Sequence, residues 1–257
     1  LASAVVAILT AVLSPEAFFA WGWRIAFLLS ALLVCVGLYI RTHIKESPEF
    51  QKMKARNAET KIPFFTMLKN YPKNILRGMG ARYIDGVLFN VFGVFSISYL
   101  SNDLNMDRTT ALTGVLIASF IMCFFIPLFG ALSDKVGRAK TYIWGSLITG
   151  VSAFPALFFM TMHVDSTLIV WTSIIIPFGI LYASVYGPEA ALFCELFDTD
   201  VRYTGISFVY QFSGIFASGI TPMIATALLH ANDHKPWYIA TYVFVVGLIS
   251  ALSLIHI

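Results

Sequence analysis

Two opposite charges, Arg82 and Asp85, lie inside a run of apolar residues and are the strongest candidates for chemistry in this sequence. Residues three apart share one face of a helix, so the two side chains can partly neutralise each other. Within a membrane, a carboxyl group can accept a proton and an arginine can anchor a carboxylate. Two structural alternatives stay open, an ion pair with no further role and an Arg82 side chain that reaches the membrane interface.

Polar groups also recur in two later apolar runs. Tyr182, Tyr186 and Glu189 have the i, i+4, i+7 spacing of one helix face, and Tyr210 and Gln211 belong to a polar stripe in the following run. In lipid, such groups either bond across helices or line a wet cavity. We expect these five to join Arg82 and Asp85 along a substrate and proton pathway, although Glu189 lies close enough to the next charged turn to belong there instead.

A short charged turn, GALSDKVGRAK, separates two almost purely apolar runs. Gly130 and Gly137 allow close helix packing and a tight reversal of the chain. Topology alone would explain the basic residues of the turn, but acidic residues contribute little to orientation in a membrane. Asp134 stands four residues before Arg138, which favours a pairing network at the end of the helix.

Enzyme chemistry has no support in the residues. Cys35, Cys123 and Cys194 each stand alone in apolar runs, without the spacing of a disulfide or metal site. No nucleophile with a nearby base, and no glycine-rich loop tied to a strand, is recognisable. We therefore expect no catalytic residue, no metal, no cofactor beyond protons as the coupling ion, and no nucleic-acid partner.

The composition places the chain in lipid. Hydrophobic residues make up 58% of it and charged residues only 12%, whereas soluble domains carry roughly 25% charged residues. A bilayer core of about 30 Å takes about 20 apolar residues as helix. Eight such runs are predicted, near 1–14, 23–40, 78–100, 110–132, 141–162, 166–190, 203–229 and 236–257.

The basic residues set the orientation. Nine of the Lys and Arg residues fall within 41–77, and others follow in the 130–140 turn and at Arg202, all on one side of an alternating topology. By the positive-inside rule that side is cytoplasmic. We expect residues 1–41 to be two spans of a first bundle, 42–77 a cytoplasmic linker, and 78–257 a six-helix bundle. Because the chain starts and stops inside apolar runs, we also expect it to be part of a longer protein.

Three motifs resemble one family. The turn GALSDKVGR is similar to the cytoplasmic loop motif of the major facilitator superfamily, ELFDTDVRYTG at 195–205 resembles a signature of its metabolite:proton symporter branch, and GWRIAFLLS followed by ESPEF resembles the sixth helix and central loop of that branch. The resemblance covers nearly the whole chain, as spans five to twelve of twelve. Ala139 departs from it, since a second basic residue is common there.

The resemblance implies an all-α membrane protein of the major facilitator fold, acting as a multi-pass, monomeric carrier in the bacterial cytoplasmic membrane and surrounded by lipid. It implies proton symport of a small metabolite such as a carboxylate, a betaine or a shikimate-like compound, by alternating access. It also implies a cytoplasmic gate in which Asp134 and Arg138 pair with Glu195 and Arg202, which are seven residues apart. An uncoupled facilitator and a non-transporting membrane sensor are the alternatives.

Overall fold

The structure is a computed structural model that describes residues 5, 9, 12–43 and 63–255. The chain divides into two compact units, Leu1–Asn57 and Ala58–Ile257. Every regular element in the described residues is a helix, so the all-α fold predicted from the sequence is confirmed.

The first unit holds one long apolar helix. Its elements are α2 (Pro15–Ala17), the π-helical turn η1 (Phe18–Gly22) and α3 (Trp23–His43), and together Phe18–His43 is long and apolar enough to cross a membrane. Most apolar side chains of α3 are exposed, among them Phe27, Leu32 and Leu33, as expected of a helix that faces lipid or another helix. The span predicted near 1–14 lies almost wholly outside the described residues.

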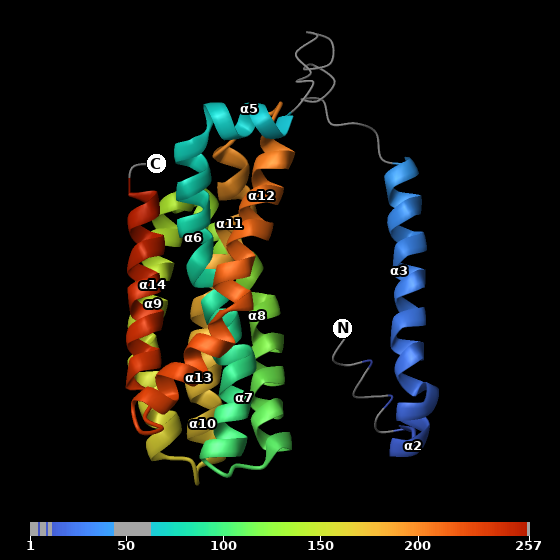
Figure 1. Cartoon of the computed structure of the whole chain (residues 1–257), viewed down its shortest axis with the longest axis vertical. Coiled ribbons are helices and arrows are strands. Elements are labelled where there is room, and N and C mark those ends of the chain that lie inside the picture. The colour runs from blue at the N-terminus through green and yellow to red at the C-terminus, as the bar shows by residue number, and fades with distance from the viewer. Residues whose placement is uncertain (1–4, 6–8, 10–11, 44–62, 256–257) are drawn as a thin grey trace. The chain divides into compact units, whose positions relative to one another are not determined.

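The second unit is a helical bundle with a short helix, α5 (Pro63–Asn70), lying across one end (Figure 1). Six segments of the bundle could span a membrane: Pro72–Asp103, Arg108–Val136, Arg138–Met162, Thr167–Glu195, Arg202–Ala231 and Trp237–Leu254. Their elements are α6 (Pro72–Asn90), η2 (Val91–Phe95), α7 (Ser96–Ser98), η3 (Tyr99–Asp103), α8 (Arg108–Val136), α9 (Arg138–Met162), α10 (Thr167–Ile174), η4 (Ile175–Leu181), α11 (Tyr182–Glu195), α12 (Arg202–Gly214), η5 (Ile215–Gly219), α13 (Thr221–Ala231) and α14 (Trp237–Leu254).

Each of these segments coincides with a predicted span, but most helices extend beyond the apolar run. The first starts at Pro72 rather than near residue 78, because proline is well suited to the first turn of a helix, where no backbone donor is required. The predicted linker over 42–77 therefore ends in helical structure, α5 and the start of α6. Its residues 44–62 lie outside the described part of the chain.

Two spans of the second unit are irregular at prolines. The π-helical η4 contains Pro177, and η5 is followed by a bend at Ile220 before Pro222 in the first turn of α13. Proline lacks the N–H that an α-helix needs, and a local change of helical pitch accommodates the loss. Interrupted helices of this kind are tolerated in a membrane where protein covers the freed backbone groups.

Small residues bring the helices close. A Cβ on Gly247 of α14 would lie 2.8 Å from the carbonyl oxygen of Ser146 on α9, and one on Gly187 of α11 would lie 2.8 Å from the carbonyl oxygen of Ile126 on α8. Helices in lipid associate through such close packing, because lipid supplies no hydrophobic drive between them. Large apolar side chains such as Phe120 and Phe124 instead point outward from α8.

Most of the charge gathers at one end of this bundle, which we call the basic end. There the start of α6, the turn between α8 and α9, and the turn between α11 and α12 meet, and contacts join all three. The end carries Lys69, Lys73, Arg77, Lys135, Arg138, Lys140 and Arg202. The opposite end holds Arg108 and Lys235 among the described residues, so the charge asymmetry required by the positive-inside rule is present.

Candidate functional site

A cavity of about 420 Å³ opens between α6, α8, α11 and η5. Its volume lies within the range of small-molecule sites. The lining combines charged, aromatic and apolar side chains: Arg82, Asp85, Gly86, Phe89, Met122, Ile126, Tyr182, Tyr186 and Ser218. Four of the residues selected from the sequence, Arg82, Asp85, Tyr182 and Tyr186, are therefore brought together around one space.

Arg82 is the centre of the polar cluster at this cavity. Its guanidinium forms an ion pair with Asp85 one turn along α6, and its Nε lies 3.2 Å from Oε1 of Glu189 on α11. It also lies over the ring of Tyr210 on α12, 4.7 Å from the ring centroid. The side chains of Arg82, Asp85 and Glu189 are 15%, 4% and 1% exposed, so one cation and two carboxylates are held away from solvent.

Two tyrosines complete the cavity wall. The hydroxyl of Tyr182 donates to Oδ1 of Asp85 at 2.5 Å, which fixes that carboxylate against α6. Tyr186 stacks on Tyr182, with ring centroids 5.7 Å apart, and is itself half-exposed in the cavity. The pair thus presents an aromatic surface beside the Arg82–Asp85 ion pair, which suits a small substrate with a charged group and a flat or apolar body.

The remaining pathway candidates are placed differently. Glu189 and Tyr210 contact Arg82 but are absent from the cavity lining, so they form a layer behind it. Glu189 belongs to this cluster, since its ion-pair partner is Arg82 and not a residue of the basic end. Gln211 is exposed and is not among the residues that line the cavity.

At the basic end, Arg138 joins two turns. Its Nε and Nη2 donate to Oδ1 of Asp134 at 3.2 and 2.9 Å, and its Nη1 donates to Oε1 of Glu195 at 2.5 Å. The first contact lies within the α8–α9 turn, and the second crosses to the end of α11. All three side chains are partly exposed, so the pairs are weak enough to be broken and re-formed.

The two glycines of the turn lie in different backbone settings. Gly137 lies between α8 and α9 with φ of +110°, a conformation that L-residues with side chains rarely adopt. Gly130 faces Gly187 of α11, whose own missing side chain allows the approach. Arg202 donates from Nε to the carbonyl oxygen of Phe197 at 3.2 Å, which braces the α11–α12 turn that carries Glu195.

Several contacts around the site could not be predicted from the sequence. Tyr142 of α9 donates its buried hydroxyl to the carbonyl oxygen of Ala81, directly before Arg82. At the basic end the Tyr71 hydroxyl donates to Asp198, and Asn74 donates to the carbonyl oxygen of Leu196 at 2.6 Å. Each joins residues far apart in sequence, so no spacing rule reveals them; the one available signal is a polar side chain in an apolar helix.

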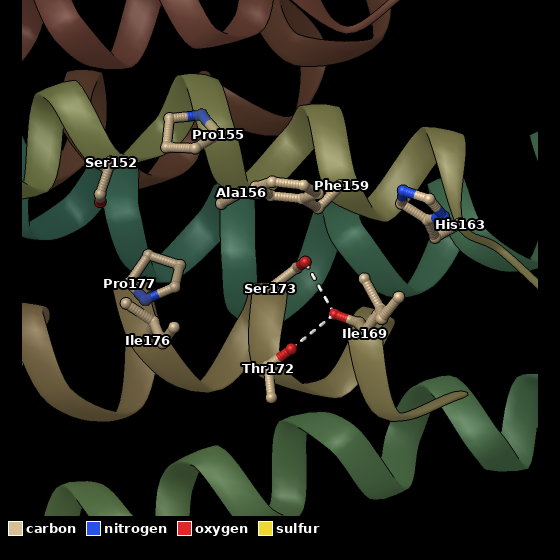
Figure 2. Close-up of a pocket in the computed structure, with 10 residues that line it drawn as sticks. All are labelled: Ser152, Pro155, Ala156, Phe159, His163, Ile169, Thr172, Ser173, Ile176 and Pro177. Carbon is tan, nitrogen blue, oxygen red and sulfur yellow. Dashed lines mark hydrogen bonds between the residues drawn. The ribbon is translucent and has the colours of Figure 1, made fainter. Parts of the chain in front are cut away.

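A second cavity, of about 380 Å³, lies between α9 and the α10–η4 segment (Figure 2). Its walls are mainly apolar, and no Asp, Glu, Lys or Arg is among its lining residues. The Thr172 and Ser173 hydroxyls both donate to the carbonyl oxygen of Ile169 within their own helix, as the dashed lines show (Figure 2). His163 is the one lining residue that can carry a charge, so this cavity lacks the permanent ion pair found beside Arg82. The described residues also contain no cluster of three or more His, Cys, Asp or Glu that could bind a metal.

Comparison with known proteins points to one family of membrane transporters. The sequence model of the Major Facilitator Superfamily matches residues 79–257. The chain is 32% identical to the shikimate transporter of Escherichia coli K12 over 98% of its length and 58% of that protein. It is 30% identical to a putative proline/betaine transporter of Staphylococcus aureus COL over its whole length and 55% of that protein, and 28% identical to the citrate-proton symporter of Klebsiella pneumoniae over 96% of its length and 55% of that protein.

The chain thus spans about half the length of the curated relatives it matches. Those relatives are named as transporters rather than enzymes. No solved structure matches the chain.

Proposed function

Since the chain belongs to the Major Facilitator Superfamily, we propose that it is part of a secondary transporter that carries a small organic metabolite together with protons by alternating access. The shikimate and citrate relatives by name carry carboxylates, and the proline/betaine relative carries zwitterions with a carboxylate. A carboxylate is the chemical group that these names share. We therefore propose a substrate with at least one carboxylate.

One observation carries this proposal: a buried arginine with two carboxylates stands at a cavity inside a membrane-spanning bundle. A charge at membrane depth is expensive and is normally retained for function. Arg82 can bind a substrate carboxylate, and the acids around it can bind protons. Substrate and proton then act on the same guanidinium, which is a physical route to coupling.

The ion pairs at the basic end supply the contacts needed to close one side of the carrier during alternating access. We propose that it lies on the cytoplasmic side of a bacterial inner membrane, as the positive-inside rule requires. The Asp134–Arg138–Glu195 pairs would hold α8, α9 and α11 together while the cavity opens to the other side. Opening the cytoplasmic side would break the Arg138–Glu195 contact. We further propose that the protein works as a monomer, with its substrate bound between two bundles.

The test is uptake into vesicles that contain the full-length protein, with shikimate, citrate and betaine each offered with and without an imposed pH gradient. We expect at least one compound to accumulate above its outside concentration, and only while the gradient lasts. Arg82→Ala should abolish this uptake, whereas Arg77→Ala, which removes a charge from the same helix away from the cavity, should retain it. Uptake that only equilibrates would indicate a facilitator, and uptake unaffected by Arg82→Ala would refute the proposed site.

A further inference from the structure

The buried cluster contains more acid than base. Arg82 is the one cation within it, and both Asp85 and Glu189 form their ion pairs with its guanidinium. With both acids ionised the cluster carries one excess negative charge. In a low-dielectric interior an uncompensated charge is unfavourable, and one proton removes it.

The two carboxylates are not equally supported. Asp85 pairs with Arg82 on its own helix and accepts the Tyr182 hydroxyl at 2.5 Å. Neither oxygen of Glu189 accepts a hydrogen bond of normal geometry from a described residue, although Nε of Arg82 lies 3.2 Å away and the Tyr210 hydroxyl is a nearby, poorly placed donor. Hydrogen bonds favour the ionised form of an acid, so Asp85 is held as the anion and Glu189 is the weaker competitor for the guanidinium.

We infer that Glu189, and not Asp85, takes up the coupling proton, and that the substrate is a carboxylate that replaces Glu189 as the second anionic partner of Arg82. This inference rests on the proposed function. The cluster then holds at most one excess negative charge, either ionised Glu189 or the substrate. Asp85 stays ionised throughout as the permanent counter-ion of Arg82.

Other titratable groups face Glu189 from every neighbouring helix. Tyr142 of α9, Tyr182 and Tyr186 of α11, and Tyr210 of α12 surround the cluster together with Arg82 and Asp85 of α6. The tyrosines bring no positive charge, and the Tyr210 hydroxyl lies near Glu189 as a donor whose geometry falls short of a full hydrogen bond. Glu189 is thus the acid of the cluster whose charge is least compensated.

Arg82 can then exchange Glu189 for the substrate carboxylate in steps that conserve both atoms and charge. A proton from the outer solution binds to a carboxylate oxygen of Glu189, and the Nε edge of Arg82 is released. The substrate carboxylate binds at that edge from the cavity that Arg82 lines. On the cytoplasmic side the substrate leaves, Glu189 loses its proton, and the ion pair with Arg82 forms again. One proton moves with each substrate molecule, whichever of its carboxylates binds Arg82.

The first test needs no substrate. Infrared difference spectra of the purified full-length protein, recorded while the pH is lowered, should show a protonated carboxyl band that is missing in Glu189→Gln. In Asp85→Asn the band should persist but appear only at lower pH, because Arg82 then has Glu189 as its one carboxylate partner. Glu195→Gln, which removes a partly exposed acid from the same helix, should leave the band unchanged. A band that Asp85→Asn removes and Glu189→Gln keeps would overturn the inference.

The second test separates binding from coupling. Glutamine resembles protonated glutamate, so Glu189→Gln should still exchange labelled shikimate or citrate across the vesicle membrane while losing accumulation driven by a pH gradient. Retained accumulation in Glu189→Gln, or loss of exchange together with accumulation, would refute the role of Glu189. If the wild-type protein moves none of the compounds, the proposed function fails, while the infrared experiment still decides which acid binds the proton.

Discussion

The contact between α8 and α11 allows a sharp prediction at Gly187. A Cβ there would lie 2.8 Å from the carbonyl oxygen of Ile126 and 3.0 Å from the amide nitrogen of Gly130, both backbone atoms that cannot rotate away. Because comfortable contacts are about 3.5 Å or longer, Gly187→Ala must separate the helices by roughly 0.7 Å. Such overpacking typically costs about 1–3 kcal/mol.

A matched control removes the intrinsic effect of alanine. A Cβ on Gly214 of α12 would meet nothing within 4 Å, so Gly214→Ala should gain the helix propensity of alanine, up to about 1 kcal/mol, without a clash. Gly130→Ala is a second control, since its nearest atom would be 3.7 Å away, an ordinary contact.

The assay is thermal unfolding of the purified full-length protein in detergent, with the three variants compared under one condition. We expect the midpoint of Gly187→Ala to fall below that of Gly214→Ala by at least about 2 °C, since 1 kcal/mol corresponds to about 2–4 °C in a protein of this size. Gly130→Ala, also inside a helix and free of a clash, should behave like Gly214→Ala. Equal midpoints for Gly187→Ala and Gly214→Ala would show that α8 and α11 are not as close as the structure places them.

Two further predictions concern the basic end. Arg138→Ala should lower the rate of uptake while membrane insertion stays normal. Adding Glu195→Gln should lower the rate little more, because both changes remove one shared contact; rate losses that add up in the double variant would contradict this. Lys140→Ala, in the same turn, should transport like the wild type. The hydrogen bond to Asp198 raises the pKa of Tyr71 from its ordinary value of 10.0 to about 12. The contact should therefore be intact below about pH 10 and be lost as the pH rises toward about 12. A phenolate absorbance titration of wild type minus Tyr71→Phe should show that late step, and a step near the ordinary value would refute it.

The sequence predicts the spans well, because a membrane requires long apolar helices and little else. It places their ends less well, since charged residues such as Lys135 continue the helix past the apolar run. Nor does it predict the π-helical segments, as apolar content is the same in either kind of helix. The expected linker overlaps α5 and the start of α6 because its polar residues are helical there, although their composition resembles that of a loop.

Within the site, local pairs are predictable and distant ones are not. Arg82 and Asp85 pair because three residues bring two side chains onto one face, and Asp134 and Arg138 pair for the same reason. The contact between Arg82 and Glu189 depends on how α6 meets α11, which no spacing reports. Tyr210 and Gln211 are neighbours in sequence, but adjacent residues diverge by about 100° around a helix, and the contact with Arg82 comes from Tyr210.

The central claim is that the substrate and a proton cross together, and the most direct measurement follows both in one vesicle. A pH-sensitive dye inside proteoliposomes of the full-length protein should report acidification when labelled substrate enters, in a fixed ratio of about one proton per substrate molecule under the charge balance at Arg82. Substrate entry with no acidification would contradict the account.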